Sequence, residues 1–124
     1  MTYLIIMTIS NALYSIEGRE DEAISSVHEI LENCSLPIIV DADGLWAVQQ
    51  NLSLLVGKEN VILTPNIPEF KRLVEAARDQ NILDEAGCTI SELSLALNCT
   101  ILLKGAQDKV CKGLTVQLIG RMIS

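Results

Sequence analysis

Hydrophobic and polar positions along the chain change period several times, which predicts alternating strands and helices. Short, nearly continuous apolar runs are typical of buried strands, whereas apolar residues spaced three and four apart indicate amphipathic helices. The predicted strands are "MTYLIIMTIS", "LPIIVDAD", "VILT" and "TILLKG", followed by a hairpin of "KVCKG" and "LTVQLIG" around Gly113. The predicted helices are "EDEAISSVHEILEN", "GLWAVQQNLSLL", "PEFKRLVEAARDQ" and "TISELSLALN".

This order of elements favours one α/β domain with a mostly parallel sheet. The chain has 124 residues, which is the length of a single domain. Four consecutive apolar residues in "PIIV" predict a strand covered on both faces, as in a parallel sheet. Leu45, Val48 and Leu52 are the expected inner face of the second helix, and Thr89 and Glu92 have the spacing of a capping box at the fourth.

Polar residues follow three of the predicted strands at the point where each strand ends. Asp41 and Asp43 follow the second strand, Asn66 follows the third, and Lys104 follows the fourth. Ligands of open α/β sheets gather outside the carboxyl ends of the strands, so this edge is the candidate site. Carboxylates, an amide and an ammonium group suit a phosphorylated or polyhydroxylated ligand. Ordinary strand-end and turn chemistry explains the same residues equally well.

The stretch "VILTPNIPEFKRL" combines a strand end with a helix start. Asn66 can cap the following helix, Pro68 is tolerated in a first helical turn, and Glu69 complements the helix dipole there. Helix-start chemistry alone therefore accounts for these three residues, and a ligand-binding role remains open.

Composition and charge narrow the classes of partner. The formal net charge of −7 and the pI near 4.5 oppose binding to nucleic acid or to an anionic membrane. The four cysteines form no C-x-x-C pair and only one histidine is present, so no metal site is predicted. We expect reduced core thiols in an intracellular protein. The apolar N-terminus is far shorter than a membrane span and carries no preceding basic residues.

Three motifs resemble the ATP- or ADP-dependent NAD(P)H-hydrate dehydratase family of the ribokinase-like superfamily. They are "PIIVDADGLW", "VILTPNIPEFKRL" and "ILLKGAQDKVCKG", in the family's order, and "GREDEAISSVHEILE" resembles the family's helix after its glycine-rich loop. The resemblance runs from about Gly18 to Gly113. It implies an α/β fold, a three-layer ribokinase-like sandwich incomplete at both ends, with residues 1–124 forming one partial carbohydrate-kinase-like domain.

The resemblance also implies a reaction and a set of contacts. The S-epimer of hydrated NADH or NADPH would be dehydrated back to NAD(P)H at the expense of ATP, with Mg²⁺ as cofactor, in the cytoplasm or mitochondria. The residues implied in binding the dinucleotide are Gly18, Asp41, Asn66, Ile67, Pro68, Glu69, Phe70, Lys71 and Arg72. Those implied in contacting the nucleotide phosphates are Lys104, Gly105, Ala106, Gln107 and Asp108.

The sequence departs from the family pattern at two places. The family's G-P-G-L-G-R loop corresponds to "YSIEGR", in which only Gly18 and Arg19 match. The family's G-G-Q-G-D motif, which supplies an anion hole and the general base, has no counterpart up to Ser124, so no catalytic residue is assigned. We therefore expect little turnover from these residues alone. Two alternatives stay open. One is a non-catalytic fragment that binds a dinucleotide, or that pairs with itself or with a full-length homologue. The other is another ribokinase-like small-molecule kinase.

Overall fold

The computed structural model describes residues 5–7, 19–41, 43–84, 89–113 and 115–119. The strands are β1 (Ile5–Met7), β2 (Ile38–Val40), β3 (Val61–Leu63), β4 (Thr100–Leu103), β5 (Asp108–Lys112) and β6 (Thr115–Ile119). The helices are α1 (Arg19–Asn33), α2 (Asp43–Gln49), the 3-10 helix η2 (Leu52–Leu55), α3 (Ile67–Asp79) and α4 (Ile90–Leu97). The predicted order of strands and helices is confirmed.

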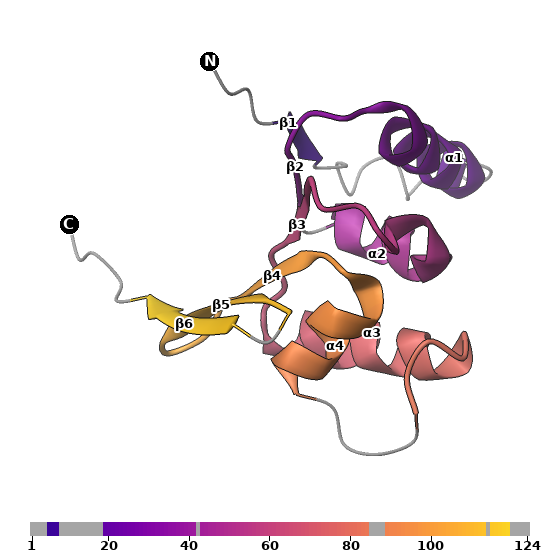
Figure 1. Ribbon diagram of the computed structural model, residues 1–124. Helices are drawn as coiled ribbons and strands as arrows, with labels where there is room; N and C mark the ends of the chain where they lie inside the picture. Colours follow the sequence, from indigo (N-terminus) through magenta and orange to yellow (C-terminus); the bar gives the residue numbers. More distant parts are fainter. Residues whose placement is uncertain (1–4, 8–18, 42, 85–88, 114, 120–124) are drawn as a thin grey trace.

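The strands form one sheet in sequence order, β1 to β6. The first four strands are parallel to one another, whereas β5 and β6 continue the sheet as an antiparallel hairpin. Helices lie between the parallel strands in the chain, because a parallel pair needs a long crossover connection. The predicted mostly parallel sheet is therefore confirmed, and all four parallel strands end at the same edge (Figure 1).

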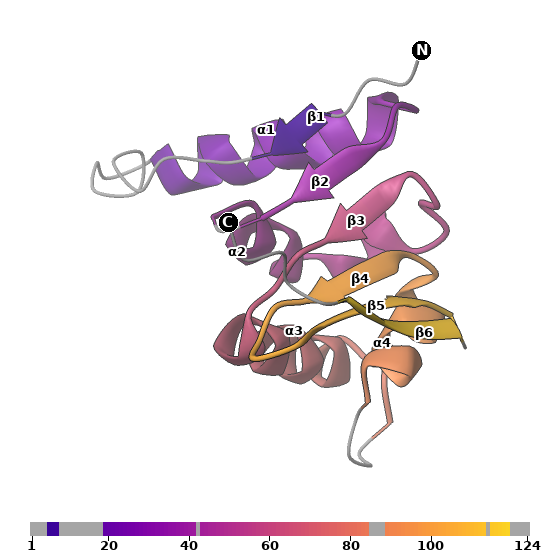
Figure 2. The same cartoon turned by 90° about the vertical axis from the view of Figure 1, so that its left-hand side faces the viewer.

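The described helices all lie on one face of the sheet. Figure 1 shows the sheet nearly edge-on with the helices to its right, and Figure 2 shows the strands in front and the helices behind them. Burial follows this arrangement, because Ile38 and Val40 are fully buried and Ile39 between them is only half-buried. The expectation that this strand is covered on both faces thus holds for one face among the described residues. The second helical layer of the expected sandwich is not among them.

A leucine- and valine-rich core fills the space between sheet and helices. Phe70 and Trp46 are half-buried and pack against this core. Its fully buried residues come from helices and from strands, and together they form one continuous core. The largest are Leu31, Ile38, Leu52, Leu55, Leu63, Leu73, Leu93, Leu97 and Ile101.

The stretch "GLWAVQQNLSLL" forms two elements and not the single helix that its pattern predicts. The α-helix α2 ends at Gln49 and the 3-10 helix η2 begins at Leu52. The Gln80 side chain occupies the break: its Nε2 donates to the Gln49 carbonyl at 2.7 Å, and its Oε1 accepts from the Leu52 amide at 2.8 Å. These bonds satisfy backbone groups that a continuous helix would pair internally. The predicted inner face, Leu45, Val48 and Leu52, is buried in both elements.

A buried serine ties α4 to the terminal hairpin. Ser94 is fully buried, and its hydroxyl donates to the Cys99 carbonyl at 2.7 Å and accepts from the Gly113 amide at 2.9 Å. Gly113 has a φ of +61°, the left-handed conformation that the β5–β6 turn needs and that glycine adopts without strain. The predicted capping box of Thr89 and Glu92 begins the same helix and is confirmed.

Two described cysteines are buried core residues. Cys99 is 3% exposed and Cys111 is fully buried, whereas Cys34 is half-buried and Cys88 lies outside the described residues. Burial raises the pKa of the Cys99 thiol to about 12, so this thiol stays protonated and unreactive at neutral pH. In the described part of the chain, no helix has the length and apolar character needed to cross a membrane.

Replacing the buried serine should destabilise the protein. In Ser94→Ala the Gly113 amide and the Cys99 carbonyl lose a buried partner, and we expect the free energy of unfolding to fall by about 1–3 kcal/mol. Urea denaturation followed by circular dichroism measures this change. Ser25→Ala on the exposed face of α1 is the matched control and should change stability by less than about 0.5 kcal/mol. Equal effects of the two substitutions would contradict the role given to Ser94.

Candidate functional site

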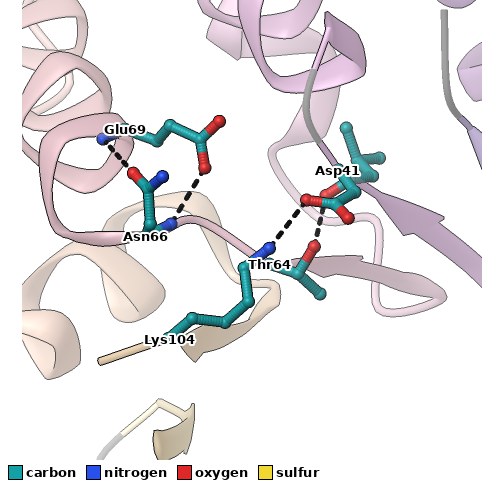
Figure 3. A network of polar contacts seen from close by, with 6 residues as sticks. Asp41, Thr64, Asn66, Glu69 and Lys104 are labelled. Atoms are coloured by element: carbon teal, nitrogen blue, oxygen red, sulfur yellow. Dashed lines mark hydrogen bonds and ion pairs between the residues drawn. The ribbon is translucent and has the colours of Figure 1, made fainter. Parts of the chain in front are cut away.

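The carboxyl ends of β2, β3 and β4 bring polar residues together at one edge of the sheet. Asp41 directly follows β2, Thr64 directly follows β3, and Lys104 directly follows β4. Asn66 stands opposite Lys104 as an isolated parallel bridge, two residues beyond Thr64. Figure 3 shows these side chains around the strand ends, together with Glu69 from the first turn of α3. We call this group the strand-end rim: Asp41, Thr64, Asn66, Glu69 and Lys104.

Lys104 spans the strand-end rim from β4 to β2. Its Nζ donates to Asp41 Oδ1 at 3.0 Å, and its backbone amide donates to the Pro65 carbonyl at 2.8 Å. The two side chains are 37% and 38% exposed, so the ion pair contributes at most about 1 kcal/mol to stability. Its main effect is geometric: the ammonium group is held above the end of β3.

Thr64 underlies this bridge and was not predicted as a site residue. It is 7% exposed, and its hydroxyl donates to the Val40 carbonyl at 3.2 Å, which ties the ends of β2 and β3 together. The hydroxyl therefore points toward the end of β2, as its dashed line in Figure 3 shows. The sequence signal was available, since a threonine between a buried strand and a proline is polar yet suited to an extended backbone.

Asn66 and Glu69 form a complete capping box at the start of α3. Asn66 Oδ1 accepts from the Glu69 amide at 2.8 Å, and Glu69 Oε1 accepts from the Asn66 amide at 2.9 Å. Within the described residues the Asn66 Nδ2 group and Glu69 Oε2 make no hydrogen bond to protein. Asn66 is exposed and Glu69 half-buried, so the amide N–H groups of one and a carboxylate oxygen of the other can reach a ligand. Helix capping thus leaves one polar group of each side chain without a protein hydrogen bond among the described residues.

The segment that follows Lys104 forms the turn between β4 and β5. The Gly105 amide donates to Asp108 Oδ1 at 3.1 Å, which closes this turn, and Ala106 and Gln107 are exposed at its tip. Asp108 is half-buried and starts β5. The turn lies next to the strand-end rim because Lys104 belongs to both.

A shallow groove of about 320 Å³ runs along α3 from Ile67 to Arg78. Its walls combine apolar side chains with Lys71 and Arg78, and Ile67 at its start is 49% exposed. Gly105 borders Ile67 from the turn after β4. Pro68 and Arg72 are exposed on the same turns of the helix. The lining residues are Ile67, Phe70, Lys71, Val74, Glu75, Arg78 and Leu103.

Two predicted site positions are not placed at the strand-end rim. Gly18 lies outside the described residues, and Asp43 begins α2 with a side chain that is likewise outside them. No group of three or more His, Cys, Asp or Glu side chains that could hold a metal ion occurs within the described part of the chain. Glu69 Oε2 offers a single carboxylate oxygen, which suits an ion that keeps most of its waters.

Comparison with known proteins identifies the family from this same region. The profile of the NAD(P)H-hydrate dehydratase family matches residues 18–119, which include every element from α1 to β6. The chain belongs to the NAD(P)H-hydrate dehydratase family. The resemblance stated from the three motifs is therefore confirmed.

Curated relatives named ATP-dependent (S)-NAD(P)H-hydrate dehydratase support the same assignment. The zebrafish protein (Danio rerio) is 40% identical over 101 residues, covering 77% of this chain and 31% of its own length. The Schizosaccharomyces pombe protein is 38% identical over 101 residues, covering 79% and 30%. The human protein is 39% identical over 101 residues, covering 77% and 29%. The chain thus spans about 30% of the length of these dehydratases.

A solved structure shows the same fold at low sequence identity. A ribokinase-like superfamily protein from Enterococcus faecalis superposes on 86% of this chain with a TM-score of 0.61 and 18% identity, over 35% of its own length. The predicted ribokinase-like α/β fold is thereby confirmed. In this NAD(P)H-hydrate dehydratase family member the strand-end rim and the α3 groove lie inside the matched region.

Two substitutions at Asn66 should separate helix capping from the free amide group. Asn66→Ala removes the cap, and we expect the free energy of unfolding to fall by about 1 kcal/mol. Asn66→Asp keeps an oxygen that accepts from the Glu69 amide, so its stability should stay within about 0.5 kcal/mol of wild type. Chemical denaturation of both variants checks the difference. Equal destabilisation by Ala and Asp would show that capping is not what the side-chain oxygen contributes.

Proposed function

We propose that the protein takes part in the ATP-dependent dehydration of the S-epimer of hydrated NAD(P)H, and that its strand-end rim binds both substrates. The observation that carries the proposal is the meeting of Asn66, Glu69 and Lys104 at one sheet edge, inside the region matched by the dehydratase family. Asn66 and Glu69, which can form hydrogen bonds to a dinucleotide, thus lie beside Lys104, a cation that can bind phosphates.

The first turn of α3 is the proposed dinucleotide side. Asn66 Nδ2 has two N–H donors without a protein partner in the described chain, and Lys71 and Arg72 are exposed cations on the following turn. Both phosphates of a dinucleotide carry negative charge, which the cations and the N-terminal end of the helix favour. Ile67 and Phe70 offer apolar contacts beside them. With Pro68 between them, these residues make one continuous contact segment from Asn66 to Arg72.

The segment from Lys104 to Asp108 is the proposed ATP side. Lys104 acts as a point charge for phosphate, because its ammonium group is exposed at the strand-end rim and is anchored by its backbone. The exposed tip of the turn, Ala106 and Gln107, leaves room for the nucleotide beside it. Gly105 keeps the backbone free of a side chain where the turn leaves β4.

Mg²⁺ is proposed as an ion that arrives with the triphosphate. Mg²⁺ typically binds through one or two carboxylates, several waters and substrate phosphates. The one carboxylate oxygen of Glu69 that makes no protein hydrogen bond fits such an ion, whereas the described residues offer no dedicated cage. When bound, the ion would neutralise charge on the phosphates that Lys104 also faces.

The proposed reaction has two stages. The γ-phosphoryl group of ATP passes to the hydroxyl oxygen of the hydrated nicotinamide ring, which releases its proton to water, and ADP leaves. Phosphate then leaves with its bonding electrons while a neighbouring ring carbon loses a proton, which restores the ring double bond. Phosphoryl transfer depends mostly on positioning and charge neutralisation, and these are what Asn66, Glu69 and Lys104 can supply. A general base is not among the residues assigned here.

Calorimetric titration with NADPH, the repaired product, tests the dinucleotide side. We expect Asn66→Asp to lower the affinity for NADPH about tenfold, because it replaces two N–H donors by a carboxylate that repels phosphate, while the fold stays intact. Asp79→Asn at the C-terminal end of α3, outside the groove lining, is the control and should bind as wild type does. Unchanged affinity in Asn66→Asp would contradict the proposed contact.

Recovery of NADH absorbance from the hydrate with ATP and Mg²⁺ tests turnover, and a lack of recovery would limit the protein to binding.

A second candidate function is pairing with another copy of the chain. The observation that favours it is the sheet face opposite the helices, where Ile39, Ile62, Leu102 and Val110 alternate with the buried core residues. No described helix lies over this face (Figure 2). An apolar sheet face of this kind is stabilised when it is buried.

The intracellular compartment, cytoplasmic or mitochondrial, stays a prediction.

Sedimentation analysis tests the pairing. If the open face is an interface between copies, wild type should sediment as a dimer and Ile62→Lys, which places a charge at the centre of the face, should be at least tenfold weaker in self-association. Glu32→Gln on α1 changes the net charge by the same amount and should leave the dimer unaffected. A monomeric wild type at high concentration removes this candidate.

A further inference from the structure

Both the backbone and the ammonium group of Lys104 are held by hydrogen bonds. Its backbone amide donates to the Pro65 carbonyl at 2.8 Å and its backbone pairs with Asn66. At the other end, its Nζ donates to Asp41 Oδ1 at 3.0 Å, so the side chain crosses from the end of β4 to the end of β2. A free lysine side chain has a large rotamer entropy that binding must remove. In the folded protein, the hydrogen bond to Asp41 already restricts the rotamers of the Lys104 side chain.

The bridge leaves the ammonium group able to bind an anion. An ammonium group has three N–H donors, and Asp41 accepts one of them. The Thr64 hydroxyl donates to the Val40 carbonyl and makes no hydrogen bond to Lys104 Nζ. Nζ is therefore held over the end of β3 with donors left for phosphate oxygens.

We propose that Asp41 is a positioning residue, which holds the Lys104 ammonium group for the polyphosphate of the nucleoside triphosphate. This inference rests on the proposed function, and it differs from the resemblance, which places Asp41 in contact with the dinucleotide. Asp41 and Lys104 are 38% and 37% exposed, so solvent and salt weaken the repulsion between the Asp41 carboxylate and a phosphate. The hydrogen bond that restrains Lys104 acts at the contact distance of 3.0 Å, where salt screens charges less than at longer range.

The test compares two substitutions of Asp41 that differ in the acceptor they leave. Asp41→Asn keeps a side-chain oxygen that can accept from Nζ, whereas Asp41→Ala removes it. Calorimetric titration with inorganic tripolyphosphate and with ATP measures the affinity of each variant. We expect Asp41→Ala to bind both about threefold to fivefold more weakly, Asp41→Asn to bind at least as tightly as wild type, and Lys104→Met to bind at least tenfold more weakly.

Other outcomes overturn the inference. If Asp41 only cancels the lysine charge, both Asp41 variants bind tripolyphosphate more tightly than wild type. If Asp41 contacts the dinucleotide, both variants lose affinity for NADPH and keep their affinity for tripolyphosphate. A wild-type protein that does not bind tripolyphosphate also overturns it, because Lys104 is then not a phosphate ligand.

Two further measurements separate this inference from a structural role and from the proposed function. Urea denaturation should give all three variants stabilities within about 1 kcal/mol of wild type, because the pair is exposed. The NMR signal of the Lys104 ammonium group should stay in Asp41→Asn near its wild-type position and move in Asp41→Ala. A protein that returns no NADH from the hydrate, yet shows the difference between Asn and Ala, keeps this inference and contradicts the catalytic proposal.

Discussion

Parallel pairing of β2, β3 and β4 is the constraint on which the rest of the structure depends. Strands that run in the same direction must end at the same edge, so residues separated by more than sixty positions in sequence, Asp41 and Lys104, become neighbours at 3.0 Å. The leucine- and valine-rich core beneath the strands holds that register, because a slip by one residue would exchange buried and half-buried side chains. The chemistry of the strand-end rim is thus a consequence of core packing.

The strand-end rim uses residues for structure and leaves part of each residue free. Asn66 caps α3 through its oxygen and Glu69 caps through one carboxylate oxygen, while the amide N–H groups of Asn66 and the other Glu69 oxygen make no protein hydrogen bond in the described chain. Lys104 gives one ammonium N–H to Asp41. The helix-start interpretation and the ligand-binding interpretation of "TPNIPEF" are therefore compatible. The first describes the atoms that hold the side chains in place, and the second concerns the polar atoms that remain.

The order of the elements, the parallel sheet, the terminal hairpin, the Thr89–Glu92 capping box and the Asn66 cap could be predicted from the sequence, because each has a local signal in periodicity or in residue spacing. The break between α2 and η2 could not, because its cause is a hydrogen-bonding partner from α3, Gln80, far away in sequence. The meeting of Asp41, Asn66 and Lys104 followed from the topology rule for parallel strands. The Asp41–Lys104 pair itself required coordinates, since many rotamers of an exposed lysine are compatible with its sequence context.

Mapping of backbone amide shifts by NMR during titration with NADPH and with ATP tests the central claim most directly. The account predicts that both ligands move amides at one edge of the sheet: residues 41–44, 64–72 and 104–108. NADPH should act most strongly on the first turn of α3, and ATP on the turn after Lys104. Shifts concentrated at the opposite edge, in residues 34–37 and 57–60, with silence at the strand-end rim, would contradict the assignment of the site.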